Sequence, residues 1–163
     1  MPVTASWWLK DHVISIVMDG DFSDEDIQMA SNTAYALIDS SDEPYVHVLL
    51  DNTTIGQTNA RAADMNRAAR PMLKHERLGW LGVYGKNNVL TRFATNVVMQ
   101  LVHNRFRMVN TLEEALDFLS NLHDAIPDYA TWQQNQHADQ LTDAIADAPV
   151  DKAAQTDTSE PTE

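Results

Sequence analysis

The chain has 163 residues, which is long enough for one domain with a core and too short for two ordinary domains. Its formal net charge of −13 argues against general nucleic-acid binding, and the absence of cysteine excludes disulfides, a thiolate nucleophile and cysteine-ligated metal sites. The start lacks the regions of a signal peptide, and the most apolar stretch, residues 93–102, is too short to span a bilayer, so we expect a cytoplasmic protein without a transmembrane segment.

Hydrophobic periodicity gives the first elements in chain order. Residues 7–10 and 13–19 are predicted to form two short strands about a turn. Ser23, with Asp26 three residues later, predicts a capping box at the start of a helix that ends before Pro44. Residues 45–51 are almost continuously apolar, which indicates a buried strand. A second helix is predicted from about residue 59 to 75, interrupted or kinked by Pro71.

The second half continues the alternation of strands and helices. Residues 78–85 predict a strand, Asn87 or Asn88 is expected to cap a third helix to about residue 103, and residues 106–109 predict a short strand. Thr111 is predicted to cap the last core helix, with Glu114 completing a capping box. This alternation predicts an α/β layer fold with a mostly parallel sheet, and the two consecutive first strands predict one antiparallel pair at its edge.

The composition changes after residue 123. We expect one folded domain over residues 1–123, followed at 124–148 by a loosely docked or partly helical extension. Residues 149–163 have almost no side chains that could be buried, so they predict a disordered acidic tail.

Four segments carry a resemblance to a known family: the YVHVLLDNT strand, the GWLGVYG strand, the apolar RFATNVVMQLV helix and the closing FRMVNTLEEALDFL. Their order and spacing resemble those of the SpoIIAA-like (STAS/SEC14-like) bacterial proteins, which have a STAS-type fold, over about residues 6–122. The resemblance implies a mixed, mostly parallel sheet of about five strands with four helices. It also implies a non-catalytic role in signalling or regulation.

The turn after the 45–51 strand departs from this family. Anti-sigma-factor antagonists of this fold carry a phosphorylatable serine there, in an Asp-Ser-Ser-Gly-like turn at the start of the next helix. Here the turn reads NTTIGQTNAR, which lacks the motif but supplies hydroxyl groups, of which Thr58 is kept as a candidate phosphoacceptor.

Asp51 is a second candidate phosphoacceptor, because it closes a strand and Asp19 and Asp21 lie near the end of another. Carboxylates in that arrangement can bind Mg²⁺. The paired acids after the first strand and the lysine after the last strand of a phosphoacceptor domain are missing, so a turn or cap role beside Asn52 and Thr53 is the simpler interpretation.

The remaining polar residues do not assemble into a catalytic set. The six histidines show no ligand spacing such as i, i+4 on one helix, and His47 is predicted to be a hydrogen-bonded core imidazole. No Ser-His-Asp or paired-carboxylate arrangement can be recognised. We therefore expect no enzyme activity, no cofactor and no metal.

Basic residues are concentrated in one stretch. Residues 61–107 hold nine of the eleven lysines and arginines and two acids, a balance of +7 in an acidic chain. On the second helix, an apolar stripe of Ala62, Met65, Ala69 and Met72 lies opposite a basic stripe of Arg67, Arg70, Lys74 and Arg77. The basic stripe is either a solvated face paired with the chain's own acids or a surface that binds an acidic partner or an anionic ligand.

These observations favour a non-catalytic STAS-like binding module that acts through a protein partner, through a second copy of this chain, or through an anionic or apolar ligand. A small-molecule or lipid carrier, with a pocket between the sheet and residues 90–102, is one alternative. A phosphoacceptor or enzyme that uses Asp51 is another. No nucleic acid is expected among the partners.

Overall fold

The computed structural model describes the backbone of residues 1–85 and 105–146 and the side chains of these ranges up to residue 139. The chain divides into two compact units, residues 1–129 and 130–163. The first unit contains the sheet and the helices that cover it, and the second contains most of helix α5 (Tyr129–Ala146).

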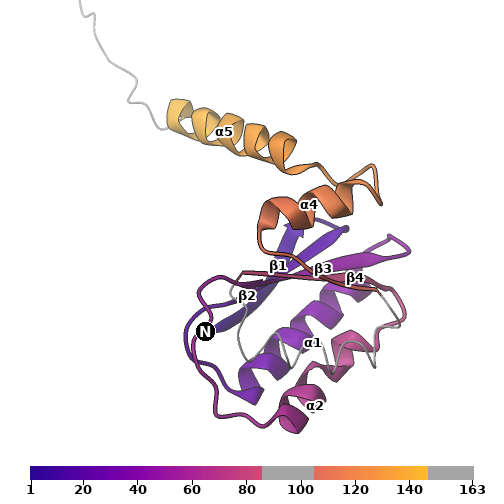
Figure 1. Cartoon of the computed structure of the whole chain (residues 1–163). Coiled ribbons are helices and arrows are strands. Elements are labelled where there is room, and N and C mark those ends of the chain that lie inside the picture. The colour runs from indigo at the N-terminus through magenta and orange to yellow at the C-terminus, as the bar shows by residue number, and fades with distance from the viewer. Residues whose placement is uncertain (86–104, 147–163) are drawn as a thin grey trace, which may run out of the picture. The chain divides into compact units, whose positions relative to one another are not determined.

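The first unit is built on a five-stranded sheet, as the sequence predicts (Figure 1). Its strands are β1 (Val3–Leu9), β2 (Val13–Met18), β3 (Val46–Asn52), β4 (Leu78–Gly85) and β5 (Phe106–Met108), and they lie in this order across the sheet. The β1–β2 pair is antiparallel and the other three pairs are parallel. The expected mostly parallel sheet with an antiparallel edge pair is therefore confirmed.

Helices α1 (Asp24–Ser40) and α2 (Ala62–Leu73) cover one face of the sheet, and α4 (Leu112–Ser120) covers the other (Figure 1). Buried Ser31 joins the two helices of the first layer, because its hydroxyl donates to the Ala69 carbonyl at 3.3 Å and accepts from the Met72 amide at 3.2 Å. The core fills the space between this layer and the sheet, with Ile14, Ile38 and Val48 all fully buried.

The capping signals have different outcomes. At α1 the predicted capping box is confirmed, since the Ser23 hydroxyl accepts from the Asp26 amide and the Asp26 carboxylate accepts from the Ser23 amide. The latter bond is the main reason that the pKa of Asp26 is lowered. At α4, Thr111 is the N-cap as predicted, but Glu114 does not complete a box, because its carboxylate accepts from the Asn110 amide at 3.0 Å.

Helix α2 is shorter than the predicted 59–75 and continues through Pro71 without interruption. Its buried stripe also differs from the prediction, since Ala62 is exposed and Ala68 is buried beside Met65 and Met72. The expected third helix, the pocket beside residues 90–102 and the tail at 149–163 lie outside the described residues. None of the described helices is long and apolar enough to cross a membrane.

Candidate functional site

A depression of about 590 Å³ lies where the loop before α2 meets the N-terminus of α1. The loop is held in place by hydrogen bonds from its backbone amides, since the Gly56 amide donates to the Gly20 carbonyl at 2.8 Å and the Gln57 amide donates to the Asp21 carboxylate at 2.7 Å. The depression is acidic, because four carboxylates and one guanidinium belong to its lining. The residues concerned are Asp21, Asp24, Asp26, Asp64 and Arg61.

Thr58 lines this depression and is half-buried. Its hydroxyl accepts a hydrogen bond from the Ala60 amide at 3.1 Å, so it forms a local turn that leads into α2. A phosphate on Thr58 would stand among the carboxylates of the lining, where like charges repel it. The structure therefore places Thr58 at the entrance to α2 in a negatively charged setting.

Asp51 lies near the carboxyl end of β3 and does not line this depression. Its carboxylate accepts from the Thr53 amide at 2.8 Å and from the Thr53 hydroxyl at 2.7 Å, which is the geometry of a turn residue. Burial, the Asp51 charge and a hydrogen bond to Asp51 raise the pKa of Tyr84. Among the described residues, Asp51 does not join Asp19 and Asp21 in a close group of metal-ligand atoms.

The next residue, Asn52, is a buried polar group for which no sequence pattern predicts a special role. It is 1% exposed, and neither its side-chain oxygen nor its side-chain nitrogen has a hydrogen-bond partner among the described residues. Leaving a buried polar group unpaired costs about 1–3 kcal/mol. Within the described part of the chain, the amide at the carboxyl end of β3 is therefore unsatisfied.

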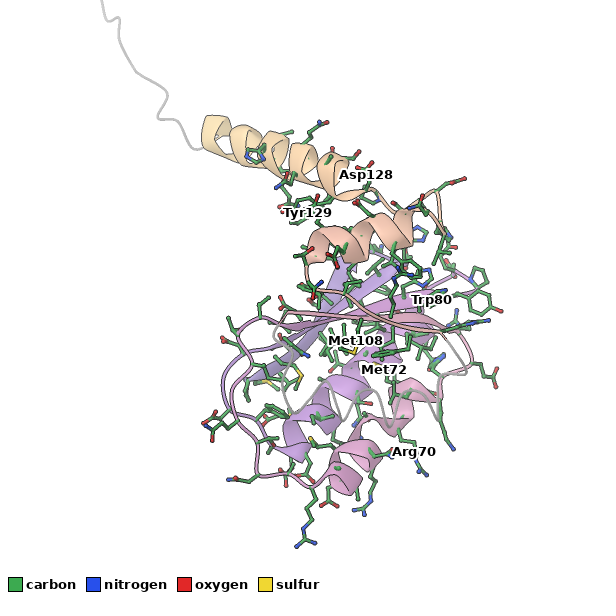
Figure 2. The ribbon with its side chains drawn as sticks, in the orientation of Figure 1. Arg70, Met72, Trp80, Met108, Asp128 and Tyr129 are labelled. Atoms are coloured by element: carbon green, nitrogen blue, oxygen red, sulfur yellow. The ribbon has the colours of Figure 1, made fainter. Side chains whose placement is uncertain are left out.

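The structure divides the predicted basic stripe into two parts. Arg67, Arg70 and Lys74 are exposed on or directly after α2, and Figure 2 shows Arg70 on the outer side of the helix. Arg67 lies 3.4 Å from the Asp64 carboxylate, one turn away. For the Arg70 and Lys74 side chains, the described part of the chain supplies no hydrogen bond and no ion pair. Arg77 does not belong to this surface, because α2 ends four residues before it.

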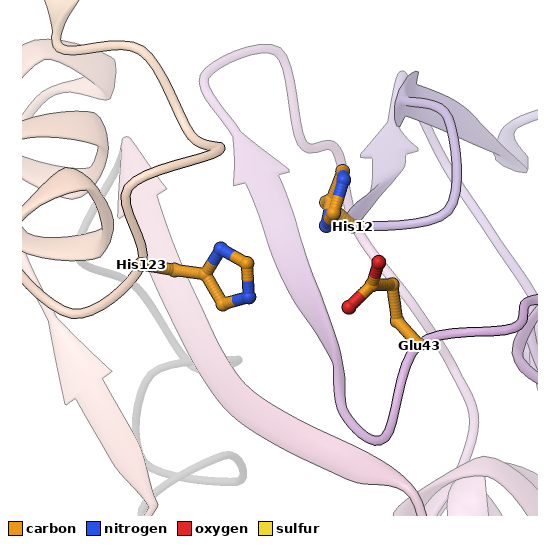
Figure 3. A group of neighbouring side chains, drawn as sticks. All are labelled: His12, Glu43 and His123. Atoms are coloured by element: carbon orange, nitrogen blue, oxygen red, sulfur yellow. The ribbon is translucent and has the colours of Figure 1, made fainter.

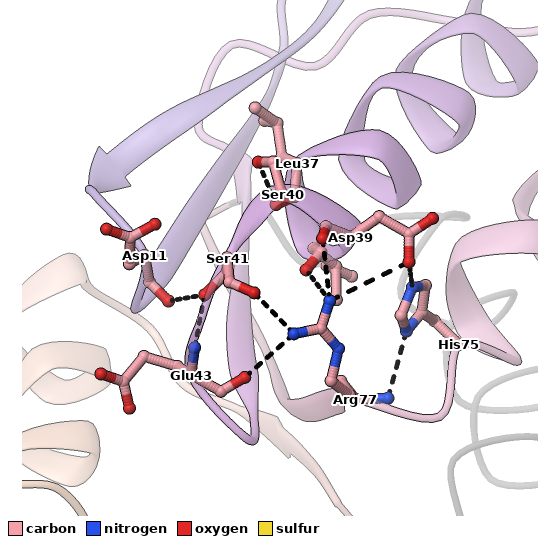
Figure 4. Close-up of polar contacts among 9 residues, drawn as sticks. Asp11, Leu37, Asp39, Ser40, Ser41, Glu43, His75 and Arg77 are labelled. Atoms are coloured by element: carbon pink, nitrogen blue, oxygen red, sulfur yellow. Dashed lines mark hydrogen bonds and ion pairs between the residues drawn. The ribbon is translucent and has the colours of Figure 1, made fainter.

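Arg77 instead binds the C-terminus of α1 (Figure 4). One guanidinium nitrogen, Nη2, donates to the carbonyls of Ile38 at 2.7 Å and Asp39 at 3.1 Å, and Nη1 donates to the carbonyls of Ser41 at 2.6 Å and Glu43 at 3.3 Å. These carbonyls lie at the negative end of the helix dipole, and the last turn of α1 has no cation of its own. Arg77 is thus a capping residue supplied by another segment.

His75 completes this junction. Its Nδ1 accepts from the Arg77 amide at 3.1 Å and its Nε2 lies 3.1 Å from the Asp39 carboxylate. Exposed Tyr35 of α1 packs against the His75 ring at 4.5 Å between centroids. An exposed aromatic side chain therefore lies next to the segment that carries Lys74.

His47 is a buried imidazole, as predicted, with 6% exposure. Its Nδ1 accepts from the Trp80 amide at 2.9 Å. Burial, and to a smaller extent the charges of His123, His12 and Arg105, lower its pKa to about 4.

His12 and His123 lie close to His47, although the three are far apart in the sequence. The ring centroids of His12 and His123 are 5.2 Å apart, and those of His47 and His123 are 6.4 Å apart. No spacing in the sequence signals this cluster, because each histidine comes from a different segment.

The chain matches no protein-family model and no curated protein sequence. It is similar to the crystal structure of an uncharacterised DUF3478-family protein from Shewanella loihica PV-4, described as having a SpoIIAA-like fold, at 18% identity and a TM-score of 0.52. That match covers 72% of this chain and 91% of the other.

Two further solved structures are similar to the chain. The Bacillus cell fate determinant SpoIIAA in its phosphorylated form matches at 8% identity and a TM-score of 0.48, over 72% of this chain and 98% of the other. The anti-sigma factor antagonist SpoIIAA in its unphosphorylated form matches at 7% and 0.49, over 73% and 96%. With the five-stranded sheet and its helical layers, the Shewanella match shows that the chain has a SpoIIAA-like, STAS-type fold.

Proposed function

We propose that this chain is a non-catalytic STAS-like regulatory module that binds an acidic protein partner through the outer face of α2. The observation that carries the proposal is the state of the basic stripe. Arg70 and Lys74 are exposed, and within residues 1–85 and 105–139 their side chains meet no acid. Of the three cations Arg67, Arg70 and Lys74, only Arg67 pairs with a carboxylate among the described residues.

The Arg67–Asp64 pair is a weak constraint. The Arg67 side chain is 78% exposed, and an exposed pair of this kind contributes about 0–1 kcal/mol. Arg67 can therefore exchange Asp64 for an acid on a partner at little cost. Three cations on one side of an otherwise acidic protein give a local positive field, which accelerates association with acidic surfaces.

An aromatic group beside the stripe supports a protein partner over a small anion. On α1, Tyr35 is 40% exposed. Tyr35 contacts His75, the residue that follows Lys74, so the aromatic ring adjoins the basic stripe. Tyrosine and arginine are among the side chains that are enriched at the energetic centre of protein interfaces.

We infer a non-catalytic module because the candidate reactive groups have local structural roles. The Asp51 carboxylate bonds to Thr53, the Thr58 hydroxyl bonds to the Ala60 amide, and His47 bonds to the Trp80 amide. Each group therefore has a structural role in a turn or in the core.

The test compares two variants with the same change of charge. Arg70→Glu alters the stripe, and Lys10→Glu reverses an exposed lysine at the end of β1, away from α2. Both proteins and the wild type are used as bait in extracts of the source organism, and retained proteins are quantified. The main partner is then purified and titrated at low and high salt.

We expect Arg70→Glu to weaken binding of the main partner at least about ten-fold, and Lys10→Glu to leave it nearly unchanged. Added salt should weaken wild-type binding. Equal binding by all three proteins would overturn the proposal. Sedimentation of the wild type at both salt concentrations shows whether the partner is a second copy of this chain.

A further inference from the structure

Three side chains from three different segments meet at the amino end of β3 (Figure 3). His12 lies in the turn between β1 and β2, Glu43 lies between α1 and β3, and His123 follows α4. One ligand atom from each side chain lies within 4.8 Å of the other two, and all three residues are half-buried. Figure 3 shows the two rings and the carboxylate facing one another across a shared space.

We propose that His12, Glu43 and His123 bind one divalent transition-metal ion of the zinc class. Two imidazoles and one carboxylate are the ligand set that such ions take in open sites, with a further position left for water or another ligand. Ligand atoms at about 2.0–2.2 Å from a tetrahedral ion are about 3.4 Å apart. Small side-chain rotations bring the observed spacing of up to 4.8 Å to that distance.

The backbone that carries two of the ligands is already fixed. The hydroxyl of Ser41, which is 4% exposed, donates to the Asp11 carbonyl at 2.9 Å and accepts from the Glu43 amide at 3.0 Å (Figure 4). The His47 amide donates to the His12 carbonyl at 2.9 Å. The ligands on the β1–β2 turn and before β3 are therefore preorganised, which reduces the entropy lost when a metal binds.

The charges next to the ligands favour a cation. Asp11 precedes His12, Asp42 precedes Glu43 and Asp124 follows His123, so each ligand has an acid beside it in sequence. Neighbouring acids raise the local concentration of cations by electrostatic attraction.

The nearby positive group and the third histidine do not block the site. Arg105 is engaged with the Tyr45 ring, 4.7 Å from its centroid. His47 accepts a hydrogen bond from the Trp80 amide at Nδ1, which assigns the ring proton to Nε2 and leaves the ring neutral. His47 is thus a neighbour of the site and not a fourth ligand.

One weak bond has to change when the metal binds. The Nδ1 of His123 accepts from the Ala125 amide at 3.3 Å. Ligation through Nε2 requires the tautomer with a proton on Nδ1, so the Ala125 bond is given up. The bond is long and exposed, so its loss is a small cost beside a metal–imidazole bond.

The test uses the untagged full-length chain, freed of metal with a chelator that is then removed. Zn²⁺ is titrated by calorimetry, and Co²⁺ is added separately because its visible spectrum reports coordination by nitrogen and oxygen ligands. The variants are His12→Gln, Glu43→Gln and His123→Gln. The control is His137→Gln, which removes an exposed histidine outside the cluster. Circular dichroism establishes that each variant is folded.

We expect one equivalent of Zn²⁺ to bind the wild type and the control with equal affinity. Each of the three site variants should bind Zn²⁺ more than about 100-fold more weakly, because loss of a residue that only supports a metal ligand already lowers metal affinity about 10- to 100-fold. Zn²⁺ should also raise the melting temperature of the wild type and not that of the variants. A folded Glu43→Gln protein that binds Zn²⁺ as tightly as the wild type would overturn the proposal. So would the absence of saturable binding to the wild type, which would leave a histidine–glutamate cluster that holds no metal. Neither outcome depends on the α2 surface.

Discussion

Replacing Arg77 by methionine tests whether one side chain from outside α1 holds the end of that helix. Methionine keeps much of the length and apolar surface of arginine, but it donates no hydrogen bond. Four carbonyls, those of Ile38, Asp39, Ser41 and Glu43, then lose their guanidinium donors. The backbone supplies one donor to this group, since the Ser41 amide lies 3.3 Å from the Ile38 carbonyl, and the chain then turns away at Ser41 in an extended conformation.

The expected loss of stability in Arg77→Met follows from the two shortest hydrogen bonds of Arg77. A hydrogen bond that involves a charged group contributes about 1.5–3 kcal/mol net, so the bonds of 2.6 and 2.7 Å together correspond to about 3–6 kcal/mol. The Arg77 side chain is 32% exposed, so in the variant water can reach some of the carbonyls that lose the guanidinium. The acceptor residues Ile38 and Ser41 are themselves 0% and 4% exposed, so water replaces only part of the loss. We expect a decrease of about 2–4 kcal/mol in the free energy of unfolding.

The assay is urea denaturation followed by circular dichroism, supported by thermal melts, with EDTA present throughout. The expected change lowers the melting temperature by about 5–15 °C for a chain of this length. Arg77→Lys should fall between the two proteins, because lysine keeps the charge but lacks the planar fork. Arg70→Met is the control, and a surface substitution of this kind should stay within about 0.5 kcal/mol of the wild type. An Arg77→Met protein as stable as the control would refute the capping role.

Two other perturbations have defined outcomes. The free energy of unfolding should fall by up to about 3 kcal/mol as the pH drops from 6.5 towards 4. The reason is that the pKa of His47 is about 4 in the folded chain and 6.5 for a free histidine, so the unfolded chain is protonated first. This contribution of His47 to stability is fully present above pH 6.5. Denaturation at several pH values with EDTA should show that the free energy of unfolding depends less on pH in His47→Gln than in the wild type. The same pH dependence in both proteins would contradict this role of His47. Gly56→Ala should cost about 1–3 kcal/mol, because its Cβ would overlap the backbone of Gly20 and Asp21. Gln57→Ala is the control, because it leaves the close contact of Gly56 with the backbone of Gly20 and Asp21 in place. If the two variants were equally stable in urea, the loop would move aside freely and the prediction would be wrong.

Local sequence patterns predicted the sheet well because each strand carries its own signal. The strand at residues 78–85 has the predicted bounds, and Ser23 caps α1 through a reciprocal box formed within four residues. β1 is the exception, since it begins at Val3 instead of residue 7. Its first residues alternate small and polar side chains, and they join the sheet through pairing with β2, where Val3 lies opposite Met18.

The basic stripe shows where periodicity alone fails. Spacing of three and four residues places Arg77 in line with Arg70 and Lys74 only if the helix continues, and α2 stops at Leu73. Lys74 closes the helix with a backbone bond to Arg70, in a segment that has no glycine to signal an end. Arg77 consequently faces the C-terminus of another helix, and no local pattern encodes that partner.

The histidine cluster could not be predicted for a related reason. Ligand spacing is visible in sequence when two ligands share one helix, but His12, Glu43 and His123 come from three separate connections between elements. They converge only because β2 and β3 are neighbours in the sheet and α4 ends above the same edge. The neutral, backbone-bonded state of His47 is likewise a consequence of burial between β4 and this cluster.

The segment from Ser41 to Glu43 links the two features that could not be predicted from the sequence, the capping of α1 by Arg77 and the histidine cluster. The carbonyls of Ser41 and Glu43 accept hydrogen bonds from Arg77, while the Ser41 hydroxyl binds the Asp11 carbonyl and the Glu43 amide. The interaction that caps α1 therefore also fixes the backbone of a proposed metal ligand. A metal bound by Glu43 and the two histidines would hold this junction from its other side, and a ligand that binds only the folded chain stabilises it by about 2.7 kcal/mol at one hundred times its dissociation constant. Arg77 thus contributes to the rigidity of the proposed metal site, whereas Arg70 and Lys74, on the surface of α2, remain available to a partner.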